Sequence, residues 1–375
     1  MKEKEEEMKK IVTIILALML TIGVFACSAP AANTPSSGTT DGKKTVKIAY
    51  TSGKKGDNGY NDEAWQGLME AKEMYDFEYV SAEVDNTDPV ATEALIRGYA
   101  EDGVYDAIIS VGTGIDTPTM AVAKDYPNQK FILIDSYCDA PNIMCIGAIS
   151  AEQAFLSGVL SGIITAGGYT DVAKMSNDTP LISYCIGMDN PDQRAGASGY
   201  MAGVKYVNPD VEIRYTIIGG FADPVKAKEV TSNNIALGAD ICTGNCGAGA
   251  LGILEACKEN GAYFISTSPS TTDYDFSLCT SLKLTNVGVR LAVQAAVENK
   301  FEAGTHRNGI ASGYCEIGLD GIALQYPQEI LDCLEAVRQS IKDGKLVTPD
   351  DLTQIDSWVA ANHLDVTQFG VKMGK

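Results

Sequence analysis

The chain has 375 residues, of which 45% are hydrophobic and 21% are charged, with 49 acidic and 29 basic side chains. The formal net charge of −20 argues against nucleic-acid polymers as partners, because such polymers are bound through clusters of Lys and Arg. After the N-terminal segment about 330 residues remain, which are too many for one hydrophobic core and predict two domains.

The N-terminal segment resembles a secretory signal peptide. Residues 11–26 are 16 consecutive residues without a charge. A membrane span needs about 20 apolar residues, so this length suits the hydrophobic region of a signal peptide better. The ten residues before it hold four acids, whereas a signal peptide begins with basic residues. We therefore expect translation to begin at Met8 and residues 1–26 to be a signal peptide.

The apolar segment ends in Val-Phe-Ala-Cys, which resembles the lipobox of bacterial lipoproteins and makes Cys27 the expected lipidation site. The alternatives are an ordinary cleaved signal or a chance cysteine. Residues 27–44 are small, polar and Pro-containing, so they cannot pack a core and are expected to form a lipidated tether. This order of segments predicts a protein anchored by lipid on the extracytoplasmic face of the cell membrane.

The first strand–loop–helix unit gives the first candidate binding residues. Lys47–Tyr50 is predicted to be a strand, followed by a loop with three glycines and a helix with apolar residues at a spacing of three to four. In an open parallel α/β sheet, the loop after such a strand lies at the carboxyl edge, where ligands bind. The side chains expected to face a cleft there are Asp57, Tyr60, Asn61 and Trp65.

The following residues repeat the same unit. Further strands are predicted at Phe77–Val84, Tyr105–Val111, Lys130–Ile134 and Met144–Ile149. Helices lie between them, and Asp88 is the expected N-cap of the helix Pro89–Tyr99. Five strands separated by helices predict a doubly wound parallel sheet.

The segment Ala151–Thr165 predicts a helix rich in small residues. Gly158 and Gly162 have the G-x-x-x-G spacing that also occurs where membrane helices associate. The apolar stretch is too short for a membrane span. We therefore expect a helix that packs closely against a neighbour inside a soluble domain.

A second series of units follows. Strands are predicted at Leu181–Ile186, Glu212–Ile218, Asp240–Thr243 and Ala262–Ser266. Pro224 suits the first turn of a helix, so Asp223 is the expected N-cap. The order again predicts a Rossmann-like lobe.

The cysteines and the known catalytic motifs restrict the chemistry. Of the ten cysteines, nine remain when Cys27 is set aside, and an odd number argues against a complete disulfide framework. Most lie in apolar strands, so buried free thiols are expected. Cys242 and Cys246 are not accompanied by a second nearby Cys pair, and with two histidines in the chain no zinc site is expected. The sequence lacks G-x-S-x-G, H-E-x-x-H and Walker-type motifs, so neither an enzyme nor a cofactor is expected.

Several segments together resemble the basic membrane protein family. They are GDNGYNDEAWQG, the helix with E-Q-A-x-x-x-G-x-x-x-G, Gly-Met-Asp, YTIIGGFADPVKAKE, Gly-Ala-Asp and the expected turn Thr280–Lys283. The resemblance covers roughly residues 46–345. Members of this family are lipoprotein solute receptors of ABC importers, and several bind purine nucleosides. The resemblance implies an α/β fold of two Rossmann-like lobes with a hinge, the type I periplasmic-binding-protein fold.

The resemblance also implies discontinuous lobes, because in that family the chain crosses between the lobes several times. The expected N-terminal lobe comprises residues 45–150 and 284–310. The expected C-terminal lobe comprises residues 151–283 and 311–345. Residues 346–375 would form a C-terminal tail, with a last helix around Leu352–Ala361.

A cleft for a polar solute needs aromatic faces for stacking and a few hydrogen-bonding groups. The expected ligand-binding residues are Asp57, Tyr60, Asn61, Trp65, Asp116, Asp189, Phe221, Gly247, Ser268 and Lys283. Four residues have structural alternatives: Trp65 as a core residue, Asp189 as a helix N-cap, Asp135 as a structural loop acid and Gly247 as a turn glycine.

Three positions depart from the pattern of nucleoside-binding members. Gly196 stands where those members have a Phe that helps to stack the base. Ser266–Ser268 replaces a stretch with an acid for the ribose hydroxyls, and Gly56 replaces an asparagine. A nucleoside-like or sugar-like solute is therefore as compatible with the residues as a purine nucleoside.

The expected function is that of an extracytoplasmic receptor. It would close on one small polar solute and deliver it to the permease and ATPase of an ABC importer. The alternatives are a sensor of the same fold that presents the ligand to a signalling partner, and an enzyme that uses the same cleft.

Overall fold

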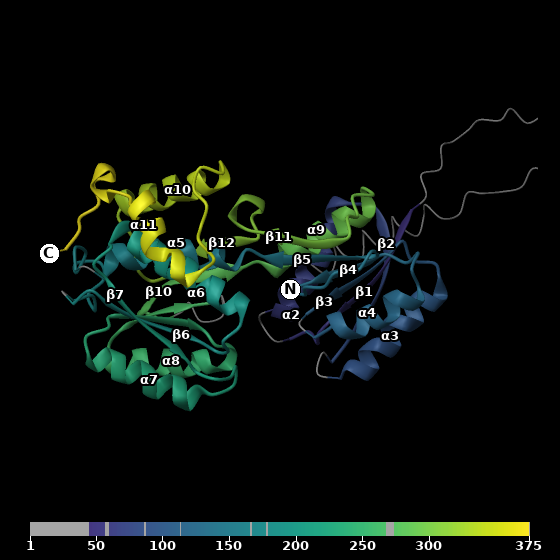
Figure 1. The fold of residues 1–375 in the computed structure, drawn as a ribbon, viewed down its shortest axis with the longest axis horizontal. Helices are drawn as coiled ribbons and strands as arrows, with labels where there is room; N and C mark the ends of the chain where they lie inside the picture. Colours follow the sequence, from purple (N-terminus) through teal and green to yellow (C-terminus); the bar gives the residue numbers. More distant parts are fainter. Residues whose placement is uncertain are drawn as a thin grey trace, which may run out of the picture. The chain divides into compact units, whose positions relative to one another are not determined.

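The computed structural model describes residues 45–56, 60–85, 88–112, 114–165, 167–177, 179–267 and 274–374. The expected signal peptide, Cys27 and the tether lie outside the described residues. Residues Thr45–Lys375 form one compact unit that holds two six-stranded sheets (Figure 1).

The first sheet has the strand order β11-β5-β4-β3-β1-β2, and all its paired strands are parallel. Its strands are β1 (Val46–Ser52), β2 (Phe77–Glu83), β3 (Ala107–Val111), β4 (Phe131–Ile134), β5 (Ile143–Ala148) and β11 (Gly304–Asn308). The helices of this half are α2 (Tyr60–Met74), α3 (Pro89–Asp102), α4 (Asp116–Asp125) and α9 (Thr285–Val297). We call this sheet and its helices the first lobe.

Successive side chains along each strand point to opposite faces of this sheet, so they pack in two separate cores. Ile48 and Tyr50 of β1 pack in the cluster that holds residues of α2 and α9. Ala49, between them, packs in a separate cluster with residues of α3 and α4. The first sheet is therefore covered by helices on both faces, as the doubly wound prediction requires.

The second sheet has the order β12-β10-β9-β8-β6-β7, and β12 is antiparallel to β10. Its strands are β6 (Leu181–Ile186), β7 (Glu212–Ile217), β8 (Ile241–Asn245), β9 (Tyr263–Ser266), β10 (Ser277–Lys283) and β12 (Cys315–Gly318). Its helices are α5 (Ser150–Ile164), α6 (Pro191–Val207), α7 (Pro224–Ala236), α8 (Ala250–Asn260), α10 (Gln328–Lys342) and α11 (Ile355–Asn362). Figure 1 shows α7 and α8 on one face and α5 and α10 on the other. We call this sheet and its helices the second lobe.

Two of the predicted helix N-caps are found, and the alternative role of Asp189 as an N-cap is wrong. The Asp88 carboxylate accepts hydrogen bonds from the amides of Val90 and Ala91, and Asp223 accepts one from Lys226. The helix that begins at Pro191 is capped by Asn190, whose side chain accepts from the amide of Gln193. Asp189 is therefore not the N-cap of this helix.

Two strands differ from the sequence-based expectation. Thr280–Lys283, expected as a turn, belongs to β10 and pairs with both β9 and β12. The strand β11 was not predicted, because Gly304–Asn308 contains no large apolar residue. It is the edge strand of the first sheet and pairs with β5 alone, so its side chains remain partly or largely exposed.

Glycines bring α5 and α6 into backbone contact. A Cβ atom at Gly158 would lie 2.2 Å from the carbonyl oxygen of Tyr200, and one at Gly203 would lie 2.2 Å from that of Phe155. The predicted close packing of this helix inside a soluble domain is therefore confirmed. In the described part of the chain, no helix has the length and apolar character needed to cross a membrane.

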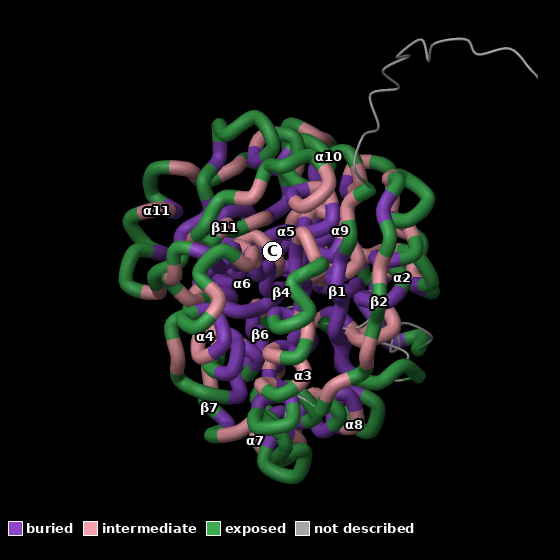
Figure 2. The backbone as a smooth tube through the Cα atoms, turned by 90° about the vertical axis from the view of Figure 1, so that its right-hand side faces the viewer, coloured by how far each residue is buried: buried purple, intermediate pink, exposed green. Residues whose placement is uncertain are grey.

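The cysteines of the described residues are free, and eight of these nine are buried, which confirms the expected buried thiols. Cys138 is the partly exposed one, and its Sγ lies 3.2 Å from that of Cys145. Figure 2 shows that the buried segments follow the strands, while exposed segments form the outer loops and outer helix faces.

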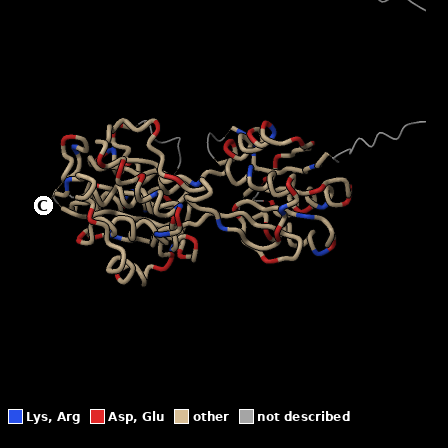
Figure 3. The backbone as a smooth tube through the Cα atoms, turned by 90° about the horizontal axis from the view of Figure 1, so that it is seen from above, with Lys and Arg blue, Asp and Glu red and all other residues tan. Residues whose placement is uncertain are grey.

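The C-terminal residues pack on the second lobe. The predicted last helix is found as α11, at Ile355–Asn362. Its Trp358 ring lies edge-on to Phe155 of α5 and beside Tyr206 of α6, with centroid distances of 5.7 and 5.5 Å. Charged residues of both signs are scattered along the described chain (Figure 3), in keeping with a charge that serves solubility.

Candidate functional site

The carboxyl ends of strands from both sheets surround a cavity of about 380 Å³. In parallel sheets these ends carry the loops and helix starts that present side chains to ligands. The lining residues are Tyr60, Glu63, Tyr137, Ala148, Ser150, Gln153, Asp192, Asn245, Gly247, Thr267, Lys283 and Thr285. We call this space the main cavity.

An ion pair joins the two sheets beside the main cavity. The ammonium of Lys283, at the end of β10, lies 3.0 Å from a carboxylate oxygen of Asp135, which directly follows β4. Asp135 is 7% exposed and has a φ of 60°, a conformation that Asp adopts more readily than most residues. The hydroxyl of Tyr314 donates a hydrogen bond of 3.2 Å to the same carboxylate. Burial lowers the pKa of Lys283, but the charge of Asp135 outweighs it and keeps this pKa above its ordinary value.

Tyr60 contributes an aromatic ring to the same part of the cavity. The ammonium of Lys283 lies 5.6 Å from the centroid of this ring. Burial, followed by the negative charge of Asp135, raises the pKa of the Tyr60 phenol well above its usual value. The phenol is therefore neutral, and its hydroxyl oxygen is buried, so the ring is what Tyr60 offers to a ligand.

A second polar cluster centres on Asp192 in the first turn of α6. Its carboxylate accepts hydrogen bonds from Ser150 at 2.6 Å and from the hydroxyl of Tyr137 at 3.5 Å. The guanidinium of Arg307 lies 3.8 Å from the carboxylate and 4.7 Å from the ring centroid of Tyr137. Because Tyr137 follows β4 and Asp192 belongs to α6, this cluster also joins the two lobes.

Of the residues predicted to bind ligand, Tyr60, Gly247 and Lys283 line the main cavity. Trp65 lies in the core and is 7% exposed. Its ring meets that of Tyr50 edge-on at 5.1 Å, and its indole N–H donates to the carbonyl of Gly53. The side chain of Asn61 lies against the backbone of Gly53 rather than among the lining residues.

The other predicted residues lie outside the lining of the main cavity. Asp116 is the first residue of α4. Asp189 forms an exposed ion pair with Arg194. Phe221 is 44% exposed, and its ring lies where a side chain at Gly187 would project. Asp57 and Ser268 lie outside the described residues.

The sequence-based prediction missed nine lining residues. These are Glu63, Tyr137, Ala148, Ser150, Gln153, Asp192, Asn245, Thr267 and Thr285. Two signals could have found some of them. Asn245 is the last residue of β8 and Thr267 directly follows β9, so both stand where the strand-end rule places ligand contacts. Gln153 belongs to the E-Q-A motif, one of the segments on which the family resemblance rests.

The residues present suit non-covalent recognition. Among the described residues, no group of three or more His, Cys, Asp or Glu side chains is arranged to hold a metal ion. The lining combines hydroxyl and amide groups with two aromatic rings, one lysine and two carboxylates. Such a set can orient a polar molecule by hydrogen bonds and stacking.

A family model described as "Bmp: ABC transporter substrate-binding protein PnrA-like" matches residues 44–342. The chain is 24% identical over 370 residues to a protein of Lactococcus lactis subsp. cremoris named "ABC transporter nucleoside-binding protein BmpA", with 91% of this chain and 99% of the relative covered. It is 26% identical over 337 residues to an uncharacterised lipoprotein of Pyrococcus furiosus, with 84% and 78% covered.

The fold is that of solved solute-binding proteins. A crystal structure of ABC transporter system solute-binding proteins from Aeropyrum pernix K1 matches with a TM-score of 0.62 and 22% identity, covering 88% of this chain and 100% of that chain. At this identity the likeness establishes the fold alone. The two-lobed type I periplasmic-binding-protein fold expected from the sequence is therefore confirmed.

Proposed function

Because the chain belongs to the Bmp family of PnrA-like ABC transporter substrate-binding proteins, we propose that it is an extracytoplasmic lipoprotein receptor for one nucleoside or nucleoside-like solute. The solute binds in the main cavity, and the receptor delivers it to a membrane permease with its ATPase. Cys27 carries the lipid that holds the receptor at the membrane. The protein performs no chemical reaction on the solute.

The main cavity is the observation that carries this proposal. Its volume of about 380 Å³ falls within the range of small-molecule sites, which is about 300–1,000 Å³. Groups from both lobes line it, so a bound molecule would bridge them and favour a closed arrangement. Tyr60 and Lys283 from the predicted set, together with Asn245, Gln153 and Thr267, are the proposed ligand contacts.

The charges around the cavity favour an uncharged solute. Glu63 and Asp192 line it, the charge of Lys283 is already matched by Asp135, and the guanidinium of Arg307 lies 3.8 Å from the carboxylate of Asp192. A phosphate or carboxylate of the solute would therefore find both of these cations already paired with acids and would lose its hydration without gaining a free cation. A nucleoside therefore fits better than the corresponding nucleotide.

Two observations bear on whether the solute is a nucleoside or a sugar-like molecule. The Lactococcus relative bears the name of a nucleoside-binding protein, which supports a nucleoside for this chain. Gly196 lacks the aromatic ring expected of nucleoside-binding members, so stacking would rest on Tyr60 and Tyr137, the two aromatic residues of the lining. The neutral polar lining suits a sugar-like solute as well, and this is the second candidate.

Thermal unfolding of residues 45–375 tests the proposal, since these residues form a compact unit by themselves. The compounds are inosine, adenosine, guanosine, the free bases, D-ribose and D-glucose, with inosine 5′-monophosphate as the charged control. A ligand at 100 times its Kd stabilises the native state by about 2.7 kcal/mol, so the transition moves upward clearly.

We expect one uncharged compound to raise the transition temperature and the monophosphate to leave it unchanged. An equal shift with the monophosphate would contradict the charge argument. No shift with any compound, or conversion of a compound by the purified protein, would contradict the proposed function.

A further inference from the structure

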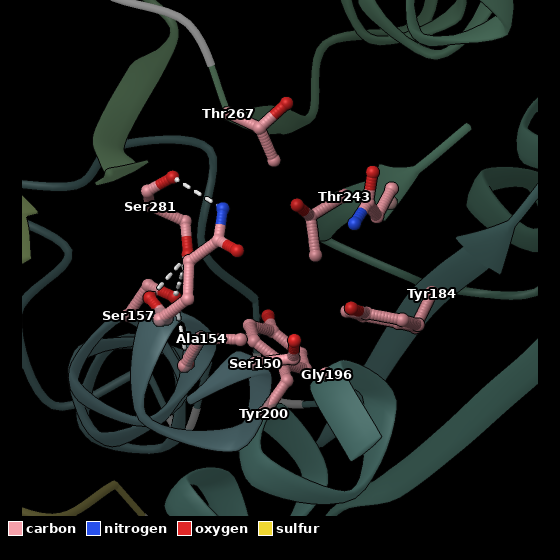
Figure 4. A pocket seen from close by; sticks show the side chains of 12 residues that line it. Ser150, Ala154, Ser157, Tyr184, Gly196, Tyr200, Thr243, Thr267 and Ser281 are labelled. Carbon is pink, nitrogen blue, oxygen red and sulfur yellow. Dashed lines mark hydrogen bonds between the residues drawn. The ribbon is translucent and has the colours of Figure 1, made fainter. Parts of the chain in front are cut away.

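A narrow side pocket lies next to the main cavity in the second lobe, and Figure 4 shows the side chains that line it. It measures about 20 Å³, which is space for one group of about the size of a water molecule. Ser150, Gln153, Asn245 and Thr267 line both the side pocket and the main cavity. A solute in the main cavity can therefore extend one small substituent into the side pocket.

The lining of the side pocket contains no charged side chain. Besides the four shared residues, it consists of Ala154, Ser157, Tyr184, Gly196, Tyr200, Thr243, Gly244 and Ser281. A charged substituent would lose its hydration here without gaining a partner of opposite charge, which is costly. The pocket therefore selects an uncharged group.

Several hydroxyl groups of the lining already donate their protons within the protein. Thr243 donates to the carbonyl of Ile265 at 2.9 Å, Ser281 donates to that of Gln153 at 2.8 Å, and Tyr200 donates to the hydroxyl of Ser161 at 2.8 Å. Their remaining lone pairs can accept a hydrogen bond from a ligand.

Other groups of the lining have not used their donors. In the part of the chain that the structure describes, no hydrogen bond is found for the hydroxyl of Tyr184, the side-chain amide of Asn245 or the hydroxyl of Thr267. Tyr184 is 4% exposed, and Figure 4 shows its hydroxyl directed from β6 toward the pocket. Burial raises the pKa of this phenol, so it stays protonated and can donate. This hydroxyl is not among the buried side-chain atoms without a partner, so it is accessible from the pocket and a ligand group can bond to it.

Gly196 keeps the pocket open. A Cβ atom at this position would have one neighbour within 4 Å, the carbonyl oxygen of Ser150 at 3.6 Å. By contrast, a Cβ atom at Gly199, one helical turn further along α6, would lie 2.0 Å from the carbonyl oxygen of Ala151. Helix packing therefore requires glycine at position 199 but not at position 196, where a larger side chain would instead project into the pocket.

We propose that the side pocket binds one uncharged hydroxyl group of the solute, and that Gly196 and Tyr184 determine this specificity. A hydroxyl both donates and accepts, so it matches a lining that offers lone pairs from Thr243 and Ser281 and a proton from Tyr184. An analogue without the hydroxyl would leave the Tyr184 hydroxyl without a ligand partner, and sites built to hydrogen-bond a substrate hydroxyl discriminate strongly against such an analogue. This inference rests on the proposed solute-binding function and names the part of the solute that the second lobe recognises.

Calorimetric titration of residues 45–375 tests the inference. The probes are inosine and adenosine with their 2′-, 3′- and 5′-deoxy forms, and D-glucose with its monodeoxy forms. The variants are Gly196→Ala, Gly196→Val and Tyr184→Phe. The control is Gly98→Ala, because Gly98 is an exposed glycine of α3 with no atom within 4 Å of an added Cβ.

For the parent compound that binds the wild type, we expect one deoxy form to bind at least about tenfold more weakly. Gly196→Val and Tyr184→Phe should weaken binding of the parent by a similar factor, Gly196→Ala should weaken it less, and Gly98→Ala should leave it unchanged. Tyr184→Phe should not further weaken binding of the deoxy form that lacks the recognised hydroxyl, because the two changes remove the same interaction.

The failures are distinguishable. If the wild type binds none of the probes, the proposed function and the inference are both overturned. If the wild type binds a parent compound but all its deoxy forms bind equally well, or if the Gly196 and Tyr184 variants keep the wild-type affinity, the inference alone is overturned. Thermal unfolding of each variant without ligand verifies that a loss of affinity does not arise from loss of the fold.

Discussion

At the scale of single residues, the fold tolerates a buried acid away from the candidate site. Asp240 precedes β8 and is 1% exposed. Its carboxylate accepts a hydrogen bond from Thr165 at 2.7 Å and from the amide of Asn177 at 3.0 Å. Burial raises the pKa of Asp240 to about 7, although these hydrogen bonds act in the opposite direction. The acid therefore makes stability depend on pH in the physiological range.

Whether stability rises or falls with pH follows from the protonation of Asp240 in the folded and unfolded states. Between its unfolded pKa near 3.8 and its folded pKa of about 7, Asp240 binds a proton in the folded state alone. Stability should therefore fall as pH rises through this interval, by up to about 1.4 kcal/mol per pH unit, and Asp240 should add no further change above it. Asp240→Asn removes this contribution. Urea unfolding at pH 4.5, 5.5, 6.5 and 7.5 should show a flatter profile for this variant than for the wild type.

The exposed Asp210 provides a matched control, since Asp210→Asn should keep the wild-type profile. Parallel profiles for wild type and Asp240→Asn would mean that Asp240 ionises alike in the folded and unfolded states.

Where a local rule applied, the sequence placed residues at the candidate site, and their role in binding stays a prediction. Tyr60, Gly247 and Lys283 stand beside strand ends, and all three line the main cavity. Tyr137 and Asp192 were missed because their importance comes from a contact between a loop and a helix start 55 positions apart in the sequence. Trp65 illustrates the opposite case, because its apolar ring is equally suited to a cleft and to the core in which it lies.

At the scale of elements, the periodic strands and helices were predictable because each has a buried face. The fully buried strand β6 was predicted with its observed bounds, Leu181–Ile186. The edge strand β11 has no such face and left no hydrophobic signal. Its pairing with β5 depends on the path of the chain after α9, which local sequence does not encode.

The contact of α5 with α6 gives a prediction at this scale. Gly203→Ala would place a Cβ atom 2.2 Å from the carbonyl oxygen of Phe155, and backbone atoms cannot move aside as a flexible side chain could. We expect a loss of roughly 1–3 kcal/mol in the free energy of unfolding, measured by urea denaturation. Gly98→Ala is the control, since an alanine in the open interior of α3 should stabilise the protein by about 0.5–1 kcal/mol. Equal effects of the two substitutions would refute the close packing.

At the scale of the whole described unit, three connections join the two lobes: β5 to α5, β10 to α9 and β11 to β12. The connections are themselves hydrogen-bonded. The amide of Ile149 donates to the carbonyl of Asn308, and that of Leu284 donates to the carbonyl of Tyr314, each at 2.8 Å. The pair of Asp135 and Lys283 lies beside them. If the two lobes close on a solute as proposed, these short, paired segments are where the chain would bend.

Breaking this ion pair should destabilise the unit. Lys283→Met would leave the carboxylate of Asp135, whose side chain is 5% exposed, without its cation. Removal of one partner from a buried ion pair lowers the free energy of unfolding by about 3 kcal/mol. Because Lys283 is partly exposed, we expect a loss of this size or smaller. Urea denaturation should also show that Asp135→Asn combined with Lys283→Met recovers part of the loss.

Lys345→Met is the matched control, because the side chain of Lys345 is 73% exposed and its pair with Asp343 should contribute little. A loss for Lys283→Met no larger than that for Lys345→Met would exclude the pair as a link between the lobes.

The central claim is that this chain binds one small solute and releases it unchanged. Native mass spectrometry tests it most directly, with residues 45–375 incubated in an equimolar pool of nucleosides, bases and sugars. We predict a single adduct with one molecule per chain, whose mass equals that of an unmodified, uncharged member of the pool and which disappears when the protein is unfolded. The absence of any adduct, or the release of a chemically altered compound, would contradict the claim.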